Sequence, residues 1–276
     1  MYFFISMPTQ KNLLNHLLEI GGVATLNNFY SQKAKTYKGG LLYTRKLFKL
    51  YLQEGLVEKI ETIGRPANKA REVFYCLTKK GADYIGRSKE YKYRKYPRSP
   101  ANVMHESMKF DIALSFLRLY PDFIFTFRYD CCLYGLRPDI LIKVESNKVK
   151  NFSRFFLVEI ERKKTIDRVF NEKVRRYEEM FQSIFLKKSH NINQFTVLFV
   201  YTDIWFDVLL RPQQYTGKDM INHINSVDVL LKNLVAHYCK NLVDSRYRFM
   251  GFHDFYKLNE LVWYSPNGNR TSILSP

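Results

Sequence analysis

The chain is poor in cysteine and has no long apolar run. Its four cysteines, in 276 residues, form no C-x-x-C pair. We therefore expect reduced thiols and no zinc site. The apolar start, MYFFISM, is too short for a signal peptide and lacks a basic leader, which favours a cytoplasmic protein. No stretch approaches the ~18 uncharged residues of a membrane helix, so we expect no membrane segment.

Two common catalytic motifs are also absent. The sequence has no G-x-x-x-x-G-K-[ST] loop, which excludes a P-loop ATPase. It has no G-x-S-x-G either, which excludes a serine hydrolase of the nucleophile-elbow type. With 46% hydrophobic and 16% aromatic residues, the chain can bury a substantial core and is not disordered.

Acidic residues are scarce relative to basic ones. The chain has 44 Lys and Arg against 26 Asp and Glu, a formal net charge of +18. Residues 1–100 hold 19 basic and 7 acidic side chains, so the first third carries most of the surplus. Such an excess points to a polyanionic partner, and without a membrane segment we favour nucleic acid over a membrane surface.

The first third reads as helices followed by a hairpin. Apolar spacing predicts helices over Lys11–Ile20 and Leu26–Gln32, and a third helix from Leu41 that Gly55 caps. The segments VEKIET and REVFYCLT alternate like the two strands of a hairpin, and KKGADYIG closes the unit as a short helix.

This order resembles a winged helix-turn-helix, and the stretches QEGLVEKIE and YCLTKKGADYI are similar to those of bacterial winged-helix domains. We assign residues 1–86 to this domain. The third helix offers side chains to a major groove, and the wing tip offers others to phosphates. These DNA-binding candidates are Tyr43, Arg45, Lys46 and Lys49 on the helix and Arg65, Lys69 and Arg71 on the wing. The alternative is a winged helix that contacts protein, with a basic face that is only solvated.

Residues 87–100, RSKEYKYRKYPRSP, form a basic, tyrosine-rich linker. Tyrosines can stack on bases while Lys and Arg hold phosphates. The alternative is a solvated connector stiffened by its prolines.

Residues 101–276 form a second domain with the predicted order helix, three strands, helix, strand, helix, strand. The three strands are FIFTFRYD, RPDILIKVE and FFLVEIER, and FTVLFVYTD is the fourth. A helix near 217–237 and a last strand, YRFMGFHDFYKL, complete the domain. This order resembles the core of the PD-(D/E)XK nuclease fold, an α/β fold with a mixed sheet.

Three carboxylates are predicted to meet on one face of this sheet. If the loop between the second and third strands is centred near Val149, Asp139 lies opposite Glu159. Glu161, two residues further on, shares the face of Glu159. Three acids so close repel one another unless a cation sits among them, and Mg²⁺ or Mn²⁺ suits oxygen ligands. The alternative is that these acids face solvent and pair with Arg137, Arg162 or Lys163.

The helix predicted over 166–185 supplies a cation to the same region. Lys173 falls within its apolar stripe, although a lysine that faces a sheet is unfavourable unless it meets negative charge. We expect Lys173 to reach the carboxylates or a scissile phosphate. The alternative is that it extends to solvent between Phe170 and Tyr177.

The motifs RPD, LVEIER and K-x-x-x-Y (Lys173, Tyr177) behind a winged helix are similar to those of the replication-relaxation family, which includes C-class mobilization relaxases. The resemblance spans roughly residues 10–200. It implies a bacterial metal-dependent DNA nickase in which Lys173 stabilises phosphate charge and Tyr177 positions it. His105 matches a family histidine, although it could equally be a hydrogen-bonding residue at a helix start. The PD-(D/E)XK pattern normally has its lysine at position 161, and Glu161 departs from that pattern.

The expected function is therefore nicking of double-stranded DNA at a plasmid or mobile-element origin. Its partners would include single-stranded DNA at the nick and accessory proteins of mobilization or replication. No two of the six histidines stand two residues apart, which excludes the His-hydrophobe-His site of tyrosine relaxases. The alternatives are a non-catalytic replication or transcription regulator on a decayed nuclease fold and a restriction-type endonuclease.

Overall fold

The computed structural model describes residues 10–19, 22–26, 40–61, 73–91, 100–146, 148–149, 152–162, 166–183, 188, 192, 194–202, 217–239 and 241–274. These residues divide into two compact units. The first comprises the described residues up to Leu114, and the second comprises those from Ser115 onwards. In the part of the chain described, no helix is long and apolar enough to cross a membrane.

The first unit combines a small antiparallel sheet with short helices. Its strands lie in the order β1-β3-β2, with β2 and β3 forming the hairpin. Its elements are α1 (Gln10–Glu19), β1 (Val23–Thr25), α3 (Gly40–Gln53), β2 (Val57–Glu61), β3 (Val73–Leu77) and α4 (Lys79–Tyr84). The predicted first and third helices, hairpin and closing helix are confirmed, and Gly55 has the positive φ of +67° that a helix cap of this type needs.

Other predictions for this unit are only partly tested. Strand β1 was not predicted. Residues 27–39, which hold most of the predicted second helix, lie outside the described residues. The wing-tip residues lie outside them as well: Arg65, Lys69 and Arg71. Of the linker predicted over 87–100, only Arg87–Tyr91 and Pro100 are described, so the winged helix, the linker and the domain boundaries stay predictions.

The face assignment of α3 agrees with its sequence pattern. Leu47, Phe48 and Tyr51 are buried, and the Phe48 ring packs edge-on against Tyr51. The basic residues of the helix, Arg45, Lys46 and Lys49, are exposed to solvent. Tyr43 is half-buried.

The second unit is a mixed α/β structure built on a seven-stranded sheet. The strand order is β10-β9-β8-β7-β6-β5-β4, in which β6, β7 and β8 are parallel and the other neighbours are antiparallel. The strands are β4 (Phe123–Tyr129), β5 (Ile140–Ser146), β6 (Ser153–Arg162), β7 (Phe195–Thr202), β8 (Tyr247–Gly251), β9 (Trp263–Tyr264) and β10 (Arg270–Thr271). The helices are α5 (Pro100–Leu119), which crosses the division between the units, α6 (Ile166–Gln182) and α9 (Gly217–Tyr238).

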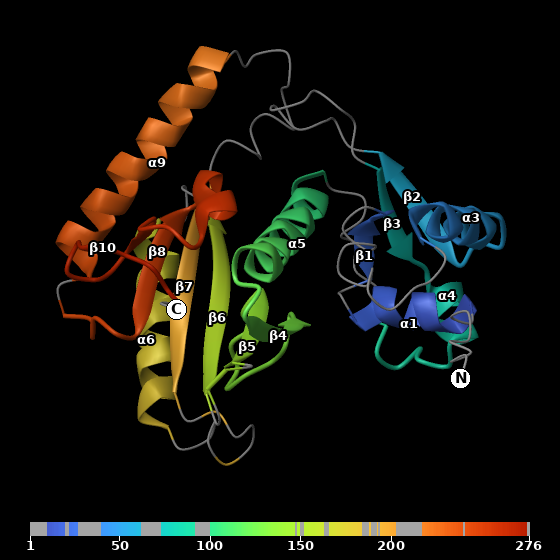
Figure 1. The fold of residues 1–276 in the computed structure, drawn as a ribbon, viewed down its shortest axis with the longest axis horizontal. Coiled ribbons are helices and arrows are strands. Elements are labelled where there is room, and N and C mark those ends of the chain that lie inside the picture. The colour runs from blue at the N-terminus through green and yellow to red at the C-terminus, as the bar shows by residue number, and fades with distance from the viewer. Residues whose placement is uncertain are drawn as a thin grey trace. The chain divides into compact units, whose positions relative to one another are not determined.

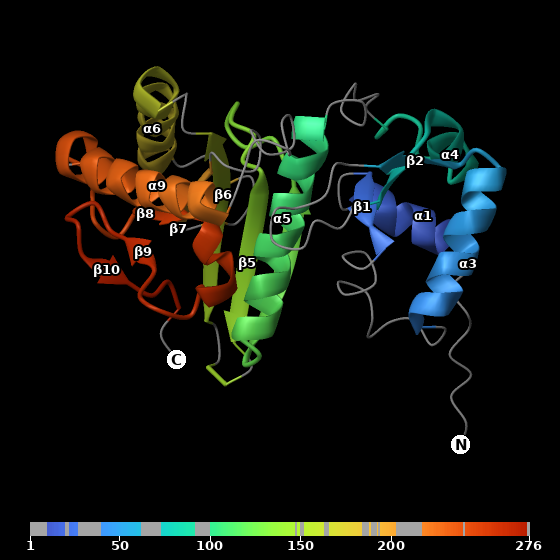
Figure 2. The same cartoon turned by 90° about the horizontal axis from the view of Figure 1, so that it is seen from above.

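The two faces of this sheet carry different helices. Odd-numbered residues of β6 and β7, such as Leu157 and Phe199, share one buried cluster with α6 and α9. On the opposite face, Phe116 near the end of α5 packs against Phe125 and Phe156. Figures 1 and 2 show α6 and α9 on one side of the sheet and the end of α5 on the other. Consequently, side chains at odd positions of β6 face α6.

The C-terminal strand prediction was wrong in part. A strand over Tyr247–Leu258 was expected, but β8 ends at Gly251 and a 3₁₀ helix, η5 (Phe252–Lys257), follows. The last pair between β7 and β8 is Tyr201 with Gly251. Because β7 ends one residue after this pair, the backbone of residues 252–257 has no neighbouring β7 residues to hydrogen-bond with. It forms the local hydrogen bonds of a 3₁₀ helix instead. The short strands β9 and β10 were not predicted.

Candidate active site

The hairpin of β5 and β6 has the predicted register. Ile140 pairs with Val158 and Leu141 with Leu157. One further step along this ladder sets Asp139 opposite Glu159. The backbone N–H of Ile160 donates to Asp139 Oδ2 at 2.8 Å, which fixes that carboxylate at the start of β5. Antiparallel partners share a face, so Asp139 and Glu159 both lie on the α6 side.

A tight turn just before β5 holds Asp139 in place. Leu133 and Leu136 exchange two backbone hydrogen bonds, of 2.9 and 2.8 Å, around Tyr134 and Gly135. Both central residues have positive φ, +50° and +77°, the geometry of a two-residue hairpin turn. The two leucines are buried in the core cluster that also contains residues of α6. Their burial fixes the chain just before Asp139.

Helix α6 brings Lys173 and Tyr177 onto the two glutamates. The ammonium group of Lys173 donates to Glu159 Oε2 at 2.8 Å and also to Glu161 Oε1. The hydroxyl of Tyr177, one turn further along, donates to Glu159 Oε1 at 2.5 Å. The four side chains form one connected network between β6 and α6.

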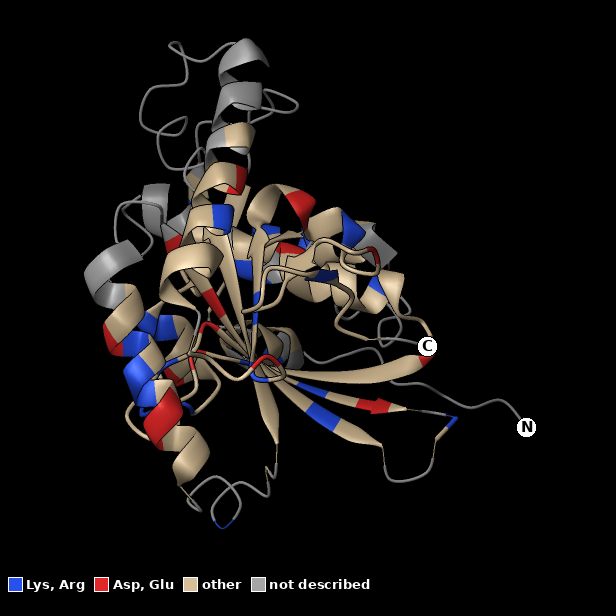
Figure 3. Cartoon of the chain, turned by 90° about the vertical axis from the view of Figure 1, so that its left-hand side faces the viewer, with Lys and Arg blue, Asp and Glu red and all other residues tan. Residues whose placement is uncertain are grey.

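The outer side of α6 is different in character. It carries surface ion pairs one turn apart, Arg176 with Glu172 and Arg175 with Glu179. Figure 3 shows red and blue bands, from acidic and basic residues, along α6. Exposed pairs of this kind contribute at most about 1 kcal/mol, whereas Lys173 is turned inward onto buried acid.

Burial sets the electrostatics of the network. Glu159 is only 2% exposed, and this burial, reinforced by the charge of Asp139 and opposed by Lys173, raises its pKa to about 7. Burial alone would lower the pKa of Lys173, but the charges of Glu159 and Glu161 outweigh it and raise that pKa. Burial also raises the pKa of Tyr177, which therefore remains a neutral donor.

Sequence reasoning missed Tyr201 on the neighbouring strand. Tyr201 of β7 pairs in register with Glu161 and shares its face. Its hydroxyl is buried and has no hydrogen-bond partner within the described residues. The alternation in FTVLFVYTD could have placed Tyr201 on the α6 face, because the odd positions of this strand share that face. The strand is otherwise apolar, so its tyrosine was not considered as a site residue.

The donor set suits a hard divalent cation. Carboxylate oxygens of Asp139, Glu159 and Glu161 are the ligands that Mg²⁺ and Mn²⁺ prefer. The buried, unpartnered hydroxyl of Tyr201 beside Glu161 adds one more oxygen. Across the described parts of the chain, however, no three His, Cys, Asp or Glu side chains are grouped closely enough to hold a metal. The positive charge between Glu159 and Glu161 is that of Lys173.

The remaining site predictions have different outcomes. Arg137 is exposed and, among described residues, forms no ion pair. The side chain of Arg162 and all of Lys163 lie outside the described residues. His105 is half-buried on the part of α5 that belongs to the first unit, and its catalytic role stays a prediction.

Comparison with known proteins gives little independent guidance. No protein-family model and no curated protein matches the chain. Among solved structures, restriction endonuclease FokI is similar with 11% identity and a TM-score of 0.28, over 90% of this chain and 43% of that one. The chain therefore spans less than half the length of that structure. A similarity this weak supports no conclusion about function.

Proposed function

We propose that the protein is a metal-dependent DNA endonuclease whose active site is formed by Asp139, Glu159, Glu161 and Lys173. The observation that carries the proposal is the contact of Lys173 with both glutamates, opposite Asp139. Acids and a lysine from three separate elements meet on one sheet face, which is the combination that phosphodiester hydrolysis requires. Lys173 would thereby supply, from α6, the cation that the PD-(D/E)XK pattern normally has at position 161.

Each residue has a distinct part in this proposal. Asp139 and the two glutamates would hold Mg²⁺ or Mn²⁺, which when bound activates water and neutralises phosphate charge. Lys173, 28% exposed at its side chain, can present its ammonium group to a phosphate oxygen as charge develops. Tyr177 holds Glu159 in position through its hydroxyl and is a positioning residue.

The first unit would deliver this site to DNA as a winged helix-turn-helix. Support comes from α3, which buries its apolar stripe and exposes Arg45, Lys46 and Lys49 together. A helix with this division can enter a major groove. The net charge of +18 supplies a general, salt-dependent affinity for the duplex.

The more specific proposal is nicking at the origin of a plasmid or mobile element. It is supported by the sequence resemblance to the replication-relaxation family, through RPD, LVEIER, Lys173 and Tyr177. In that setting the partners would be double-stranded DNA, the single strand at the nick, and accessory proteins of mobilization or replication.

One observation favours a second candidate, a non-catalytic DNA-binding regulator. Lys173 pairs with both Glu159 and Glu161, so the network can also serve as a purely structural ion cluster. A protein of this kind would keep the fold and the DNA binding but not cleave.

Plasmid cleavage separates these candidates. Supercoiled plasmids that carry mobilization or replication origins are incubated with the protein and Mg²⁺ or Mn²⁺, alongside Glu161→Gln and the control Glu179→Gln on the outside of α6. The nickase predicts open circles for wild type and Glu179→Gln only, and a restriction-type enzyme predicts linear products. Intact DNA binding without cleavage of any plasmid would contradict the nuclease proposal.

A further inference from the structure

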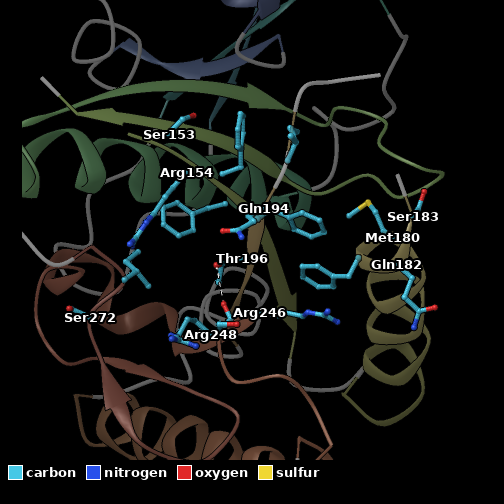
Figure 4. Close-up of a pocket in the computed structure, with 17 residues that line it drawn as sticks. Ser153, Arg154, Met180, Gln182, Ser183, Gln194, Thr196, Arg246, Arg248 and Ser272 are labelled. Carbon is cyan, nitrogen blue, oxygen red and sulfur yellow. Dashed lines mark hydrogen bonds between the residues drawn. The ribbon is translucent and has the colours of Figure 1, made fainter. Parts of the chain in front are cut away.

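A polar pocket lies within the second unit, at the end of the parallel strands that is opposite to the candidate active site. It has a volume of about 670 Å³ and is lined at the first residues of β6, β7 and β8, at the end of α6, and at Ser272 and Ile273. Arg154, Thr196 and Arg248 come from the three strands. Figure 4 shows polar side chains from these strands around the hollow.

This pocket is separate from the candidate active site. The active-site acids lie near the end of β6, whereas Arg154 lies near its beginning. Arg154 and Glu161 are seven residues apart, and at ~3.3 Å per residue this separation is roughly 20 Å along the strand. A ligand in the pocket would therefore not contact the acids directly.

Three arginines and no acidic residue are among the described residues that line the pocket. Arg246 is already engaged, because it pairs with Glu178 at 2.8 Å and stacks 4.6 Å from the centre of the Phe181 ring. Arg154 and Arg248, by contrast, have no carboxylate within ion-pair distance in the described part of the chain. Figure 4 shows both reaching toward the side where Ser272 lies, while Arg246 extends toward α6.

Arg248 is held in position without being neutralised. Its guanidinium donates to the backbone carbonyls of Asp244 and Tyr247, the latter at 2.6 Å. Burial lowers the pKa of Arg248, and the charge of Asp244 opposes this shift. A buried or half-buried arginine in this state gains from an anion with several oxygen acceptors.

The rest of the lining is neutral. Gln194 supplies an amide, and the Thr196 hydroxyl already donates to the backbone carbonyl of Ser245 at 3.3 Å. Phe181 and Phe195 stack with ring centres 4.1 Å apart and nearly parallel planes. Phe195 and the Arg246 guanidinium both stack on the Phe181 ring, so its faces are already covered.

We propose that this pocket binds a phosphate group between Arg154 and Arg248, which lie at even positions of β6 and β8 on the sheet face opposite α6. The volume is within the range of small-molecule sites. The same chemistry fits a free nucleoside phosphate and the phosphorylated end of a single strand. The proposal does not depend on nuclease activity.

Binding is measured by fluorescence anisotropy in EDTA, so that no metal site contributes. The two probes are ATP carrying a methylanthraniloyl fluorophore and 5′-phosphorylated dT4 carrying a 3′ fluorescein. The test variant is Arg154→Glu, because the described contact of this exposed side chain is the ring of Phe152 and the change should leave the fold intact. A second variant combines Arg154→Ala with Arg248→Ala, and the matched control combines Arg118→Ala with Arg128→Ala, two exposed arginines of the same unit.

The proposal predicts that both test variants lose affinity at least about tenfold for one or both probes, while the control loses about twofold or less. Loss for the ATP probe alone identifies a free nucleotide, and loss for dT4 alone identifies a strand end. Removal of the 5′ phosphate from dT4 should weaken wild-type binding to the level of Arg154→Glu. Equal losses in test and control variants, or no binding of either probe, would overturn the proposal.

Discussion

The ammonium group of Lys173 lies 2.8 Å from Glu159 Oε2, so a helix residue neutralises an acid that is buried on the neighbouring strand. The same group also contacts the carboxylate of Glu161. Fourteen residues separate Lys173 from Glu159. The contact therefore depends on the packing of α6 onto the sheet, and several properties of the protein follow from it.

Replacement of Lys173 by Met should destabilise the protein strongly. The change leaves Glu159 and Glu161 without their cation, and loss of one partner of a buried pair costs about 3 kcal/mol or more. Urea denaturation at pH 8 measures the loss. The control Arg175→Met removes a cation of the same helix whose side chain is 65% exposed, and should change the free energy of unfolding by less than about 1 kcal/mol. Equal effects would contradict the proposed network.

Stability should fall as pH rises through neutrality, and Glu159 should account for part of the fall. The pKa of Glu159 in the folded protein, about 7, is raised above the usual 4.5. Folding therefore favours its neutral form, and this contribution is complete below pH 4.5 and lost as pH rises through 7. The difference corresponds to roughly 3 kcal/mol at ~1.4 kcal/mol per pKa unit.

Glu159→Gln tests this directly, because glutamine cannot ionise. Denaturation at pH 5 and pH 8 in EDTA should show a smaller pH dependence for the variant than for wild type. The control Glu179→Gln changes an exposed acid and should keep the wild-type dependence. A variant with an unchanged dependence would show that Glu159 has an ordinary pKa.

The hydroxyl of Tyr177 should matter more than that of Tyr201. Tyr177→Phe leaves a buried carboxylate oxygen without its donor, which costs about 1–3 kcal/mol. Tyr201→Phe removes a buried hydroxyl that has no partner in the described structure, and should be neutral or slightly stabilising. Thermal unfolding of the two variants gives the comparison, and the reverse order would refute the assignment of Tyr177 as the residue that holds Glu159.

DNA binding should depend on the exposed basic residues of α3. Joint replacement of Arg45, Lys46 and Lys49 by Ala should lower affinity for a 30-base-pair duplex. It should also reduce the slope of log affinity against log salt by about one for each phosphate that the protein no longer neutralises. Anisotropy titrations at several salt concentrations measure both quantities.

The control for this experiment has the same change of charge elsewhere in the first unit. Lys11, Lys79 and Lys89 are also exposed. Their joint replacement by Ala should leave most of the affinity in place. If both triple variants weaken binding alike, general charge and not α3 is responsible.

The hairpin between β5 and β6 was predictable to the residue. The two strands are strongly apolar and the loop between them is polar, so only one pairing register buries the apolar residues on both faces. The structure has that register, with Ile140 opposite Val158. The inward position of Lys173 was predictable for a similar reason, since the apolar stripe of α6 surrounds it.

Other features depend on long-range packing that no local pattern reveals. The contribution of Tyr201 depends on the pairing of β6 with β7, which are separated by a whole helix. The end of β8 is set by where its partner β7 stops, so its sequence still reads as a longer strand. The pocket that contains Arg154 and Arg248 is formed by the starts of three strands and the end of α6, so no single segment of the sequence predicts it.

The most direct test of the nuclease proposal is the rate of plasmid nicking in Mn²⁺ by wild type, Asp139→Asn and Asp122→Asn. Asp139 faces Glu159 in the proposed site, whereas Asp122 is exposed and pairs with Lys148 at 2.9 Å. The account predicts that wild type and Asp122→Asn nick at similar rates, and that Asp139→Asn is slower by about 100-fold or more. Equal rates in all three proteins, or no metal-dependent nicking by any of them, would contradict it.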